Sequence, residues 1–152
     1  MGAKTPTILL LGYGNPGRLD DGLGPALAAL LEGQAGEGLS VDADYQLTVE
    51  HAYDLAGYPT VVFADAAMVG EAPYSCRPLE PLEPHSFTTH SLAPEAVLYL
   101  AQTLYQARPA AYLLGIRGYE FDLFRESLSA PAMRNLELAR QFVIETFGPV
   151  AV

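Results

Sequence analysis

Residues 8–24, Ile-Leu-Leu-Leu-Gly-Tyr-Gly-Asn-Pro-Gly-Arg-Leu-Asp-Asp-Gly-Leu-Gly, limit most strongly the folds that this chain can adopt. The apolar run closed by glycines is typical of a buried central strand. The glycine loop after it delivers two adjacent carboxylates, Asp20 and Asp21, just before a helical pattern. Such a loop often binds phosphate, because helix N-terminal N–H groups favour anions. Two carboxylates repel phosphate and attract a cation, so the segment predicts a cation-binding edge.

The rest of the chain continues the alternation of strands and helices. The expected strands cover 7–11, 41–47, 60–64, 74–79 and 111–116, and the expected helices cover 22–32, 50–56, 91–106 and a segment capped by Ser129. Prolines beside 74–79 indicate an edge strand. The first helix starts either at an Asp21 N-cap or at Gly24, with Pro25 in its first position. This order predicts one domain, residues 1–152, built as a three-layer α/β/α sandwich around a twisted, largely parallel sheet of about five strands.

Composition excludes several classes of partner. The chain has 152 residues and a net charge of −10 with a single lysine, so a nucleic-acid or anionic-membrane surface is not expected. One cysteine, Cys76, rules out an internal disulfide framework and fits a cytoplasmic location. The apolar run Ile8–Leu11 is too short for a signal peptide or a membrane span.

A third carboxylate follows another apolar run. Asp65 comes directly after the expected strand 60–64. Ligands of such sheets bind beyond the carboxyl ends of the strands. Asp65 and the pair Asp20 and Asp21 therefore face the same edge if their strands are parallel neighbours.

The glycine loop allows two other interpretations. Asp20 or Asp21 can serve as an ordinary helix N-cap, but an N-cap uses only one aspartate and does not explain the second carboxylate. Gly12 to Gly17 also match the dinucleotide-binding pattern G-x-G-x-x-G. That pattern needs a loop that opens a helix directly and an acidic residue about 20 positions on. Here residues intervene before the helix, and Asp42 and Asp44 come too late.

The histidines differ in their surroundings. His90 precedes the third expected helix, whose positive end should keep the imidazole neutral, as a metal ligand must be. An ordinary loop histidine is the alternative. We expect His51 to be a surface residue and His85 to lie in a proline-rich loop. Two carboxylates and one imidazole suit zinc, copper, iron or nickel, either held by this chain alone or completed by ligands of a bound partner. Cys76 is expected to be a small buried hydrophobe rather than a nucleophile.

Four motifs, in this order, resemble those of the [NiFe]-hydrogenase maturation endopeptidases. They are Gly12-x-Gly-Asn15, Asp20-Asp21-Gly22-x-Gly24, Val-Val-Phe-Ala-Asp65-Ala and Thr89-His90-Ser-Leu, and residues 114–121 are also similar. The resemblance implies an endopeptidase that removes a C-terminal extension from the nickel-loaded precursor of the hydrogenase large subunit. It also implies that Asp21, Asp65 and His90 contact the metal and carry the catalysis, with Asp20 as a secondary candidate.

In this interpretation the nickel is carried by the substrate, the partner is the large-subunit precursor, and the enzyme is a monomer. Either nickel polarises the scissile carbonyl or a water, or a carboxylate acts as general base. A nickel-sensing chaperone without catalysis and a nucleotide-binding protein are the alternatives. Exposed apolar residues of the proline-rich segment offer either a client-docking or an oligomer surface; the candidates are Tyr74, Leu79, Leu82 and Phe87.

Overall fold

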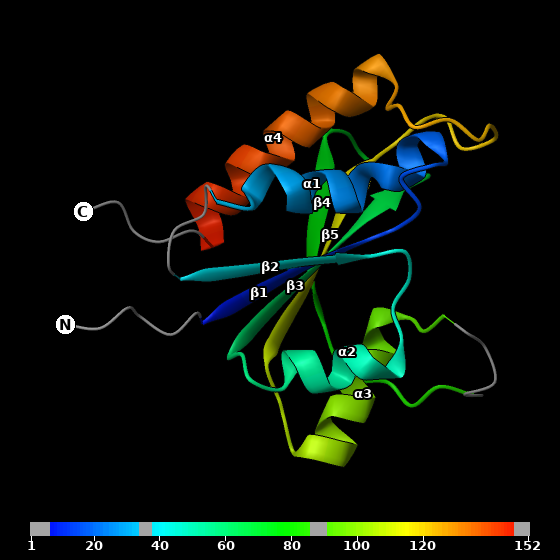
Figure 1. Cartoon of the computed structure of the whole chain (residues 1–152). Coiled ribbons are helices and arrows are strands. Elements are labelled where there is room, and N and C mark those ends of the chain that lie inside the picture. Colours follow the sequence, from blue (N-terminus) through cyan, green and yellow to red (C-terminus); the bar gives the residue numbers. More distant parts are fainter. Residues whose placement is uncertain (1–6, 34–37, 86–90, 148–152) are drawn as a thin grey trace.

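A five-stranded sheet forms the centre of the computed structural model, which describes residues 7–33, 38–85 and 91–147 (Figure 1). The strand order is β2-β1-β3-β5-β4. Strands β1, β2, β3 and β5 are parallel, and β4 pairs with β5 in the antiparallel direction at one edge. The strands are β1 (Ile8–Tyr13), β2 (Leu39–Asp44), β3 (Thr60–Ala67), β4 (Tyr74–Leu79) and β5 (Ala110–Arg117).

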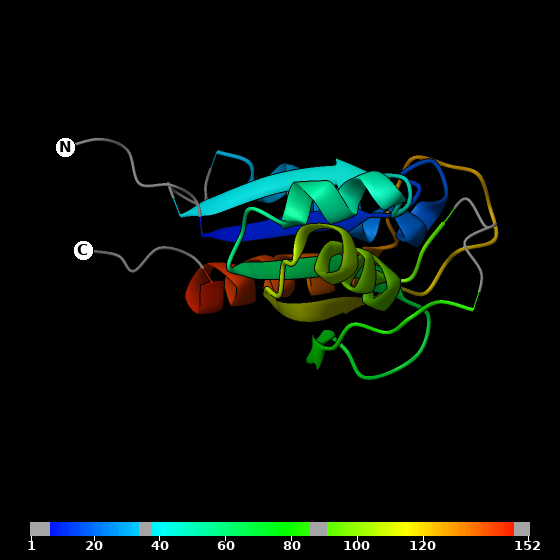
Figure 2. The ribbon, with the colours of Figure 1, turned by 90° about the horizontal axis from the view of Figure 1, so that it is seen from below.

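Helices cover both faces of this sheet, as both views show (Figures 1 and 2). The helices are α1 (Leu23–Leu31), α2 (Val49–Leu55), α3 (Pro94–Tyr105) and α4 (Ala130–Phe147), with a 3₁₀ turn η1 (Leu19–Gly22) before α1. One core lies between the sheet and α1 with α4, and a second lies between the sheet and α2 with α3. The central strands read as nearly continuous apolar runs because both of their faces are buried. The predicted three-layer α/β/α sandwich is confirmed.

The parallel strands bring the loops that follow them to one edge of the sheet. The glycine loop after β1, the chain after β3 and residues 118–129 after β5 all lie there (Figure 1). The expected order of elements is correct, and 74–79 is the antiparallel edge strand. The carboxyl edge is therefore where the predicted site residues should meet.

Several boundaries differ from the sequence-based prediction. Strand β1 runs on to Tyr13, and β3 runs on to Ala67. The extension of β3 follows from its pairing with β5, which continues through Arg117. Both expected starts of α1 were wrong: η1 comes first, and Gly22 is the N-cap.

The predicted cap of α4 is confirmed. The Ala132 N–H donates to Ser129 Oγ at 3.3 Å, and Pro131 lies in the first turn. Within the described ranges, none of the helices has the length and apolar character that crossing a membrane requires.

Candidate functional site

Glycines let helix α1 lie directly on the sheet. A Cβ on Gly24 would stand 2.4 Å from the Tyr13 carbonyl oxygen and 2.5 Å from that of Ala64. A Cβ on Gly12 would meet the Gly24 carbonyl oxygen at 2.2 Å. Only glycine permits such approaches. The contact fixes the position of η1, and hence of Asp20 and Asp21, relative to strands β1 and β3.

Asp21 is half-buried at this edge and helps to shape the glycine loop. Its Oδ2 accepts a hydrogen bond from the Asn15 N–H at 3.0 Å. The side chain of Asn15 in turn accepts from the Gly17 N–H at 2.9 Å. The loop is thus closed by its own side chains, and one carboxylate oxygen of Asp21 is engaged in that closure.

Asp65 lies within β3, two residues before the strand ends. Its Oδ1 accepts from the Ala66 N–H at 2.8 Å, and the carboxylate is hydrogen-bonded to the side chain of Tyr13. Burial raises the pKa of Asp65 to about 6. The neighbouring carboxylate of Asp21 adds to this rise, whereas the two hydrogen bonds oppose it. Burial and the Asp65 carboxylate together raise the pKa of Tyr13 well above its usual range.

The two carboxylates come from different strand-loop units and influence each other electrostatically. Strands β1 and β3 are adjacent and parallel, as the prediction of a common edge required. The negative charge of Asp21 adds to the rise in the pKa of Asp65 that burial causes. Nearby like charges in a partly buried place are typical of functional sites.

The third predicted ligand, His90, lies outside the described residues. Its meeting with Asp21 and Asp65 is therefore still a prediction. Among the residues that the structure describes, no group of three or more histidine, cysteine, aspartate or glutamate side chains could hold a metal ion. The described part of the predicted site is the carboxylate pair Asp21 and Asp65.

Asp20, although adjacent to Asp21, has a different role. Its side chain is fully buried and accepts hydrogen bonds from the backbone N–H groups of Tyr119, Glu120 and Ser129 at 2.8–3.0 Å. The Ser129 hydroxyl donates to the same carboxylate at 2.7 Å. Burial alone would raise the pKa of Asp20, but the bonds from Ser129, Tyr119 and Glu120 outweigh it and lower the pKa. Asp20 thus anchors residues 118–129 to η1 and is saturated with donors.

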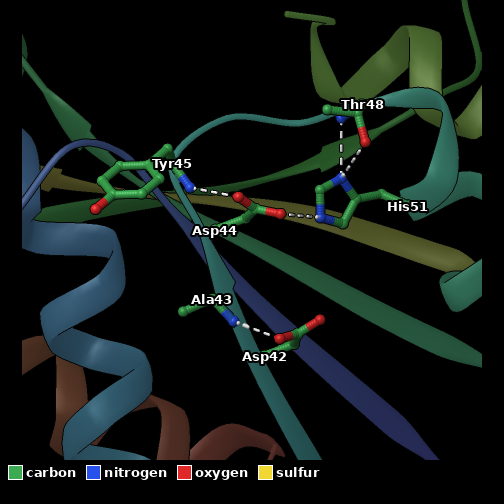
Figure 3. A network of polar contacts seen from close by, with 6 residues as sticks. All are labelled: Asp42, Ala43, Asp44, Tyr45, Thr48 and His51. Carbon is green, nitrogen blue, oxygen red and sulfur yellow. Dashed lines mark hydrogen bonds and ion pairs between the residues drawn. The ribbon is translucent and has the colours of Figure 1, made fainter.

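His51 is not a surface residue, so that expectation was wrong. Its side chain is buried, with Nδ1 accepting the Thr48 N–H at 2.9 Å and Nε2 lying 3.4 Å from Asp44 Oδ2 (Figure 3). The same Asp44 accepts the Tyr45 N–H at 2.7 Å. Because both ring nitrogens are engaged, His51 caps the start of α2 and links it to the end of β2 rather than serving as a metal ligand.

Cys76 is placed as expected, whereas the proline-rich segment is only partly so. Cys76 is half-buried on β4 against the core beneath α4, and burial raises the pKa of its thiol. A raised thiol pKa disfavours the nucleophilic thiolate. Leu82 is exposed, but Leu79 is buried and Tyr74 packs on Phe142, so two of the four docking candidates belong to the core instead. The fourth, Phe87, lies outside the described residues.

The geometry does not favour a nucleotide at the glycine loop. Turn η1 separates the loop from α1, so the loop does not open that helix directly. Asp44, at the end of β2, is engaged by the Tyr45 N–H and by His51.

Sequence reasoning missed Tyr13 and Ser129 as partners of the site carboxylates. Tyr13 continues the alternation of Leu9 and Leu11 along β1, so its side chain lies on the face of the sheet that α2 and α3 cover. That pattern was readable in the sequence. The bond from Ser129 to Asp20 joins residues 109 positions apart, and no local pattern reveals it.

Comparisons with known proteins give a consistent result for the fold. The [NiFe] hydrogenase maturation protease HycI from Thermococcus kodakarensis is 21% identical, with 94% of this chain and 93% of that chain covered and a TM-score of 0.71. The hydrogenase 2 maturation peptidase from a Thaumarchaeota archaeon is 25% identical, with 93% and 97% covered and a TM-score of 0.66. The hydrogenase maturating endopeptidase HybD from E. coli is 22% identical, with 90% and 88% covered and a TM-score of 0.65.

This chain has the fold of the [NiFe] hydrogenase maturation proteases. The similarity extends over nearly the whole length of the chains compared, so it is not confined to a common βαβ unit. No protein-family model and no curated protein sequence matches the chain. The structural neighbours thus confirm the fold that the resemblance of the motifs implied.

Proposed function

We propose that this protein is an endopeptidase that removes the C-terminal extension from a nickel-loaded precursor of the [NiFe]-hydrogenase large subunit. One observation carries the proposal. Two carboxylates, Asp21 and Asp65, interact at the carboxyl edge of the sheet in a fold shared with solved hydrogenase maturation peptidases. The paired negative charge matches a substrate that brings a cation with it.

Asp21, Asp65 and His90 recognise the nickel of the substrate in this proposal. In the free protein burial raises the pKa of Asp65 to about 6, and repulsion by the Asp21 carboxylate adds to this rise. A bound cation removes that repulsion, and an imidazole adds a ligand that nickel accepts. A precursor without nickel lacks the compensating charge and binds poorly, so the metal gates cleavage.

The reaction is hydrolysis by water. The oxygen of water attacks the carbonyl carbon of the scissile bond, its proton passes to a base, and a proton then reaches the leaving amide nitrogen. The base is a carboxylate of the site, Asp21 or Asp65. Two routes are open: the carboxylate activates the water by itself, or the substrate's nickel polarises the carbonyl or the water. Cys76, the single cysteine, stands on β4 with a raised pKa, which argues against a thiol nucleophile.

Intact-mass measurement tests the proposal. Purified protein is incubated with nickel-loaded and with nickel-free precursor, and the mass of the precursor is followed over time. We expect the loaded precursor alone to lose its C-terminal extension. Binding of the loaded precursor without any change in its mass would instead indicate a nickel-sensing chaperone.

Three variants assign the site. Asp21→Asn, Asp65→Asn and His90→Ala should each reduce processing by at least about 100-fold, as expected when a group that acts on the reacting centre is removed. Asp54→Asn, at an exposed aspartate on α2, is the matched control and should process normally. Normal processing by all three site variants would contradict the assignment.

The proposed enzyme acts as a monomer in the cytoplasm. Light scattering of the purified protein should give the mass of one chain, 16.3 kDa. A dimer that survives dilution would contradict this part of the proposal.

A further inference from the structure

We propose that Tyr13 is a positioning residue for Asp65, holding its carboxylate in the orientation in which it meets the substrate. The inference rests on the proposed function, because it assumes that Asp65 acts on the precursor. Tyr13 belongs to none of the residues that the resemblance assigned to the site. Its role is argued from the strand register, the hydrogen bonds of the carboxylate and the surroundings of the ring.

The strand register places the two residues side by side. Gly12 of β1 pairs with Ala64 of β3, so Tyr13 stands one position further along, next to Asp65. Side chains alternate along a strand, and the ring of Tyr13 packs with the core beneath α2 and α3. Phe63, two residues before Asp65, belongs to the same core. Both side chains therefore project from the same face of the sheet.

The hydrogen bond has one direction. A phenol keeps its proton at neutral pH and an ionised carboxylate can only accept, so Tyr13 donates to Asp65. The Ala66 N–H donates to Oδ1 of the same carboxylate at 2.8 Å. The phenol of Tyr13 and the Ala66 N–H thus approach the same carboxyl group from two neighbouring strands. A carboxylate has about four lone-pair positions, so the described residues leave roughly two for a cation or a water.

The position of the phenol argues against a role in packing alone. Residues Ile8 to Gly12 of β1 carry apolar side chains or none, and an apolar ring at position 13 would continue that pattern. The hydroxyl adds no apolar burial and must find a partner when it is partly buried. Its partner is a carboxylate of the proposed site. Tyr13→Phe keeps the ring and frees the carboxyl group to rotate, which is the change that the proposal needs to test.

The test compares Tyr13→Phe with a matched control. Tyr112→Phe removes the hydroxyl of a half-buried tyrosine on β5. The centroid of its ring lies 5.5 Å from that of Phe147, and its neighbours in the strand register are Val62 and Pro78. With nickel-loaded precursor, kcat of Tyr13→Phe should fall about 10-fold while KM changes less than about two-fold, because the loss lies in orientation and not in docking. The Tyr112→Phe enzyme should match the wild type in both constants.

A second readout does not depend on activity. The ¹³C chemical shift of the Asp65 side-chain carboxyl, measured by NMR in the free protein, should move in Tyr13→Phe and stay unchanged in Tyr112→Phe. If the wild type cleaves the precursor and Tyr13→Phe has the same kcat, the inference is overturned. A wild-type protein that does not cleave overturns the proposed function, and an unmoved Asp65 signal then overturns the contact between Tyr13 and Asp65 as well.

Discussion

At the scale of single residues, the adjacent aspartates Asp20 and Asp21 have different surroundings. Among the described residues, Asp20 is fully buried and receives four hydrogen bonds, whereas Asp21 is half-buried and receives one from the Asn15 N–H. A carboxylate surrounded by donors stabilises the fold, and a carboxylate with free lone pairs near another carboxylate is available to a ligand. The two neighbours therefore differ in what they do: Asp20 anchors residues 118–129, and Asp21 is the one that the proposed function assigns to the substrate.

Replacing each aspartate by asparagine tests this separation. In Asp20→Asn the amide NH₂ must face at least one backbone N–H of Tyr119, Glu120 or Ser129, because both carboxylate oxygens accept such groups. We expect the free energy of unfolding to fall by about 2–4 kcal/mol. Asp21→Asn should cost less than about 1 kcal/mol, since the amide oxygen can still accept from Asn15. Urea denaturation of both variants measures the difference, and equal losses would contradict the anchoring role of Asp20.

The roles of individual residues were only partly predictable from the sequence. Asp21 and Asp65 were found because each follows an apolar strand, a local signal that determines which edge they face. The role of Asp20 depends on donors 99 to 109 residues away, and no local pattern contains them. His51 was assigned to the surface because its partners, Thr48 and Asp44, act through the turn between β2 and α2.

At the scale of elements, the contact of α1 with the central strands positions the site. The helix lies against β1 and β3 through Gly24, whose hydrogen atoms occupy the space between two carbonyl oxygens of the sheet. Turn η1 is continuous with α1, so any displacement of the helix also displaces Asp21. The sequence predicted the helix but not η1, because the N–H groups of Leu19 and Asp20 in that turn donate to the distant carbonyl groups of Arg125 and Glu120.

Gly24→Ala tests the importance of this contact. The added Cβ would lie 2.4 and 2.5 Å from the carbonyl oxygens of Tyr13 and Ala64, so α1 must move outward. We expect a loss of about 3 kcal/mol or more in the free energy of unfolding, as for other overpacked core positions. Gly57→Ala is the control, because nothing lies within 4 Å of its Cβ, and it should change stability by less than about 0.5 kcal/mol. Thermal unfolding of the two variants gives the comparison. Similar midpoints would show that the sheet and α1 accommodate the added Cβ without loss of stability.

Element boundaries show the same limit of local reasoning. Strand β3 was expected to end at Ala64, but pairing of Asp65, Ala66 and Ala67 with β5 extends it. Alanine and aspartate have weak strand propensity, so only the neighbouring strand reveals this extension. Asp65 is consequently held by a paired backbone rather than by a loop, which gives its carboxylate a fixed origin.

At the scale of the whole molecule, the site costs the free protein stability near neutral pH. The pKa of Asp65 is raised from an ordinary 3.8 to about 6 in the folded state, mainly by burial. The folded protein therefore binds this proton more tightly than the unfolded chain does. The stabilising contribution is fully present below about pH 4 and is lost as the pH rises through about 6. A cation that arrives with the client would offset this cost when Asp65 is ionised.

Asp65→Asn should therefore make the protein more stable and inactive. Asparagine cannot ionise, so the variant lacks the loss of stability that the wild type undergoes between pH 4 and pH 7. At pH 7.5 we expect the variant to gain roughly 1–2 kcal/mol over the wild type, a value reduced from the full shift because Asp65 is partly exposed. At pH 4 the two proteins should be nearly equal. Urea titrations at both pH values, with Asp54→Asn as the control, measure the effect. A gain of the same size at both pH values would show that the asparagine stabilises by packing and that ionisation of Asp65 does not limit the free protein.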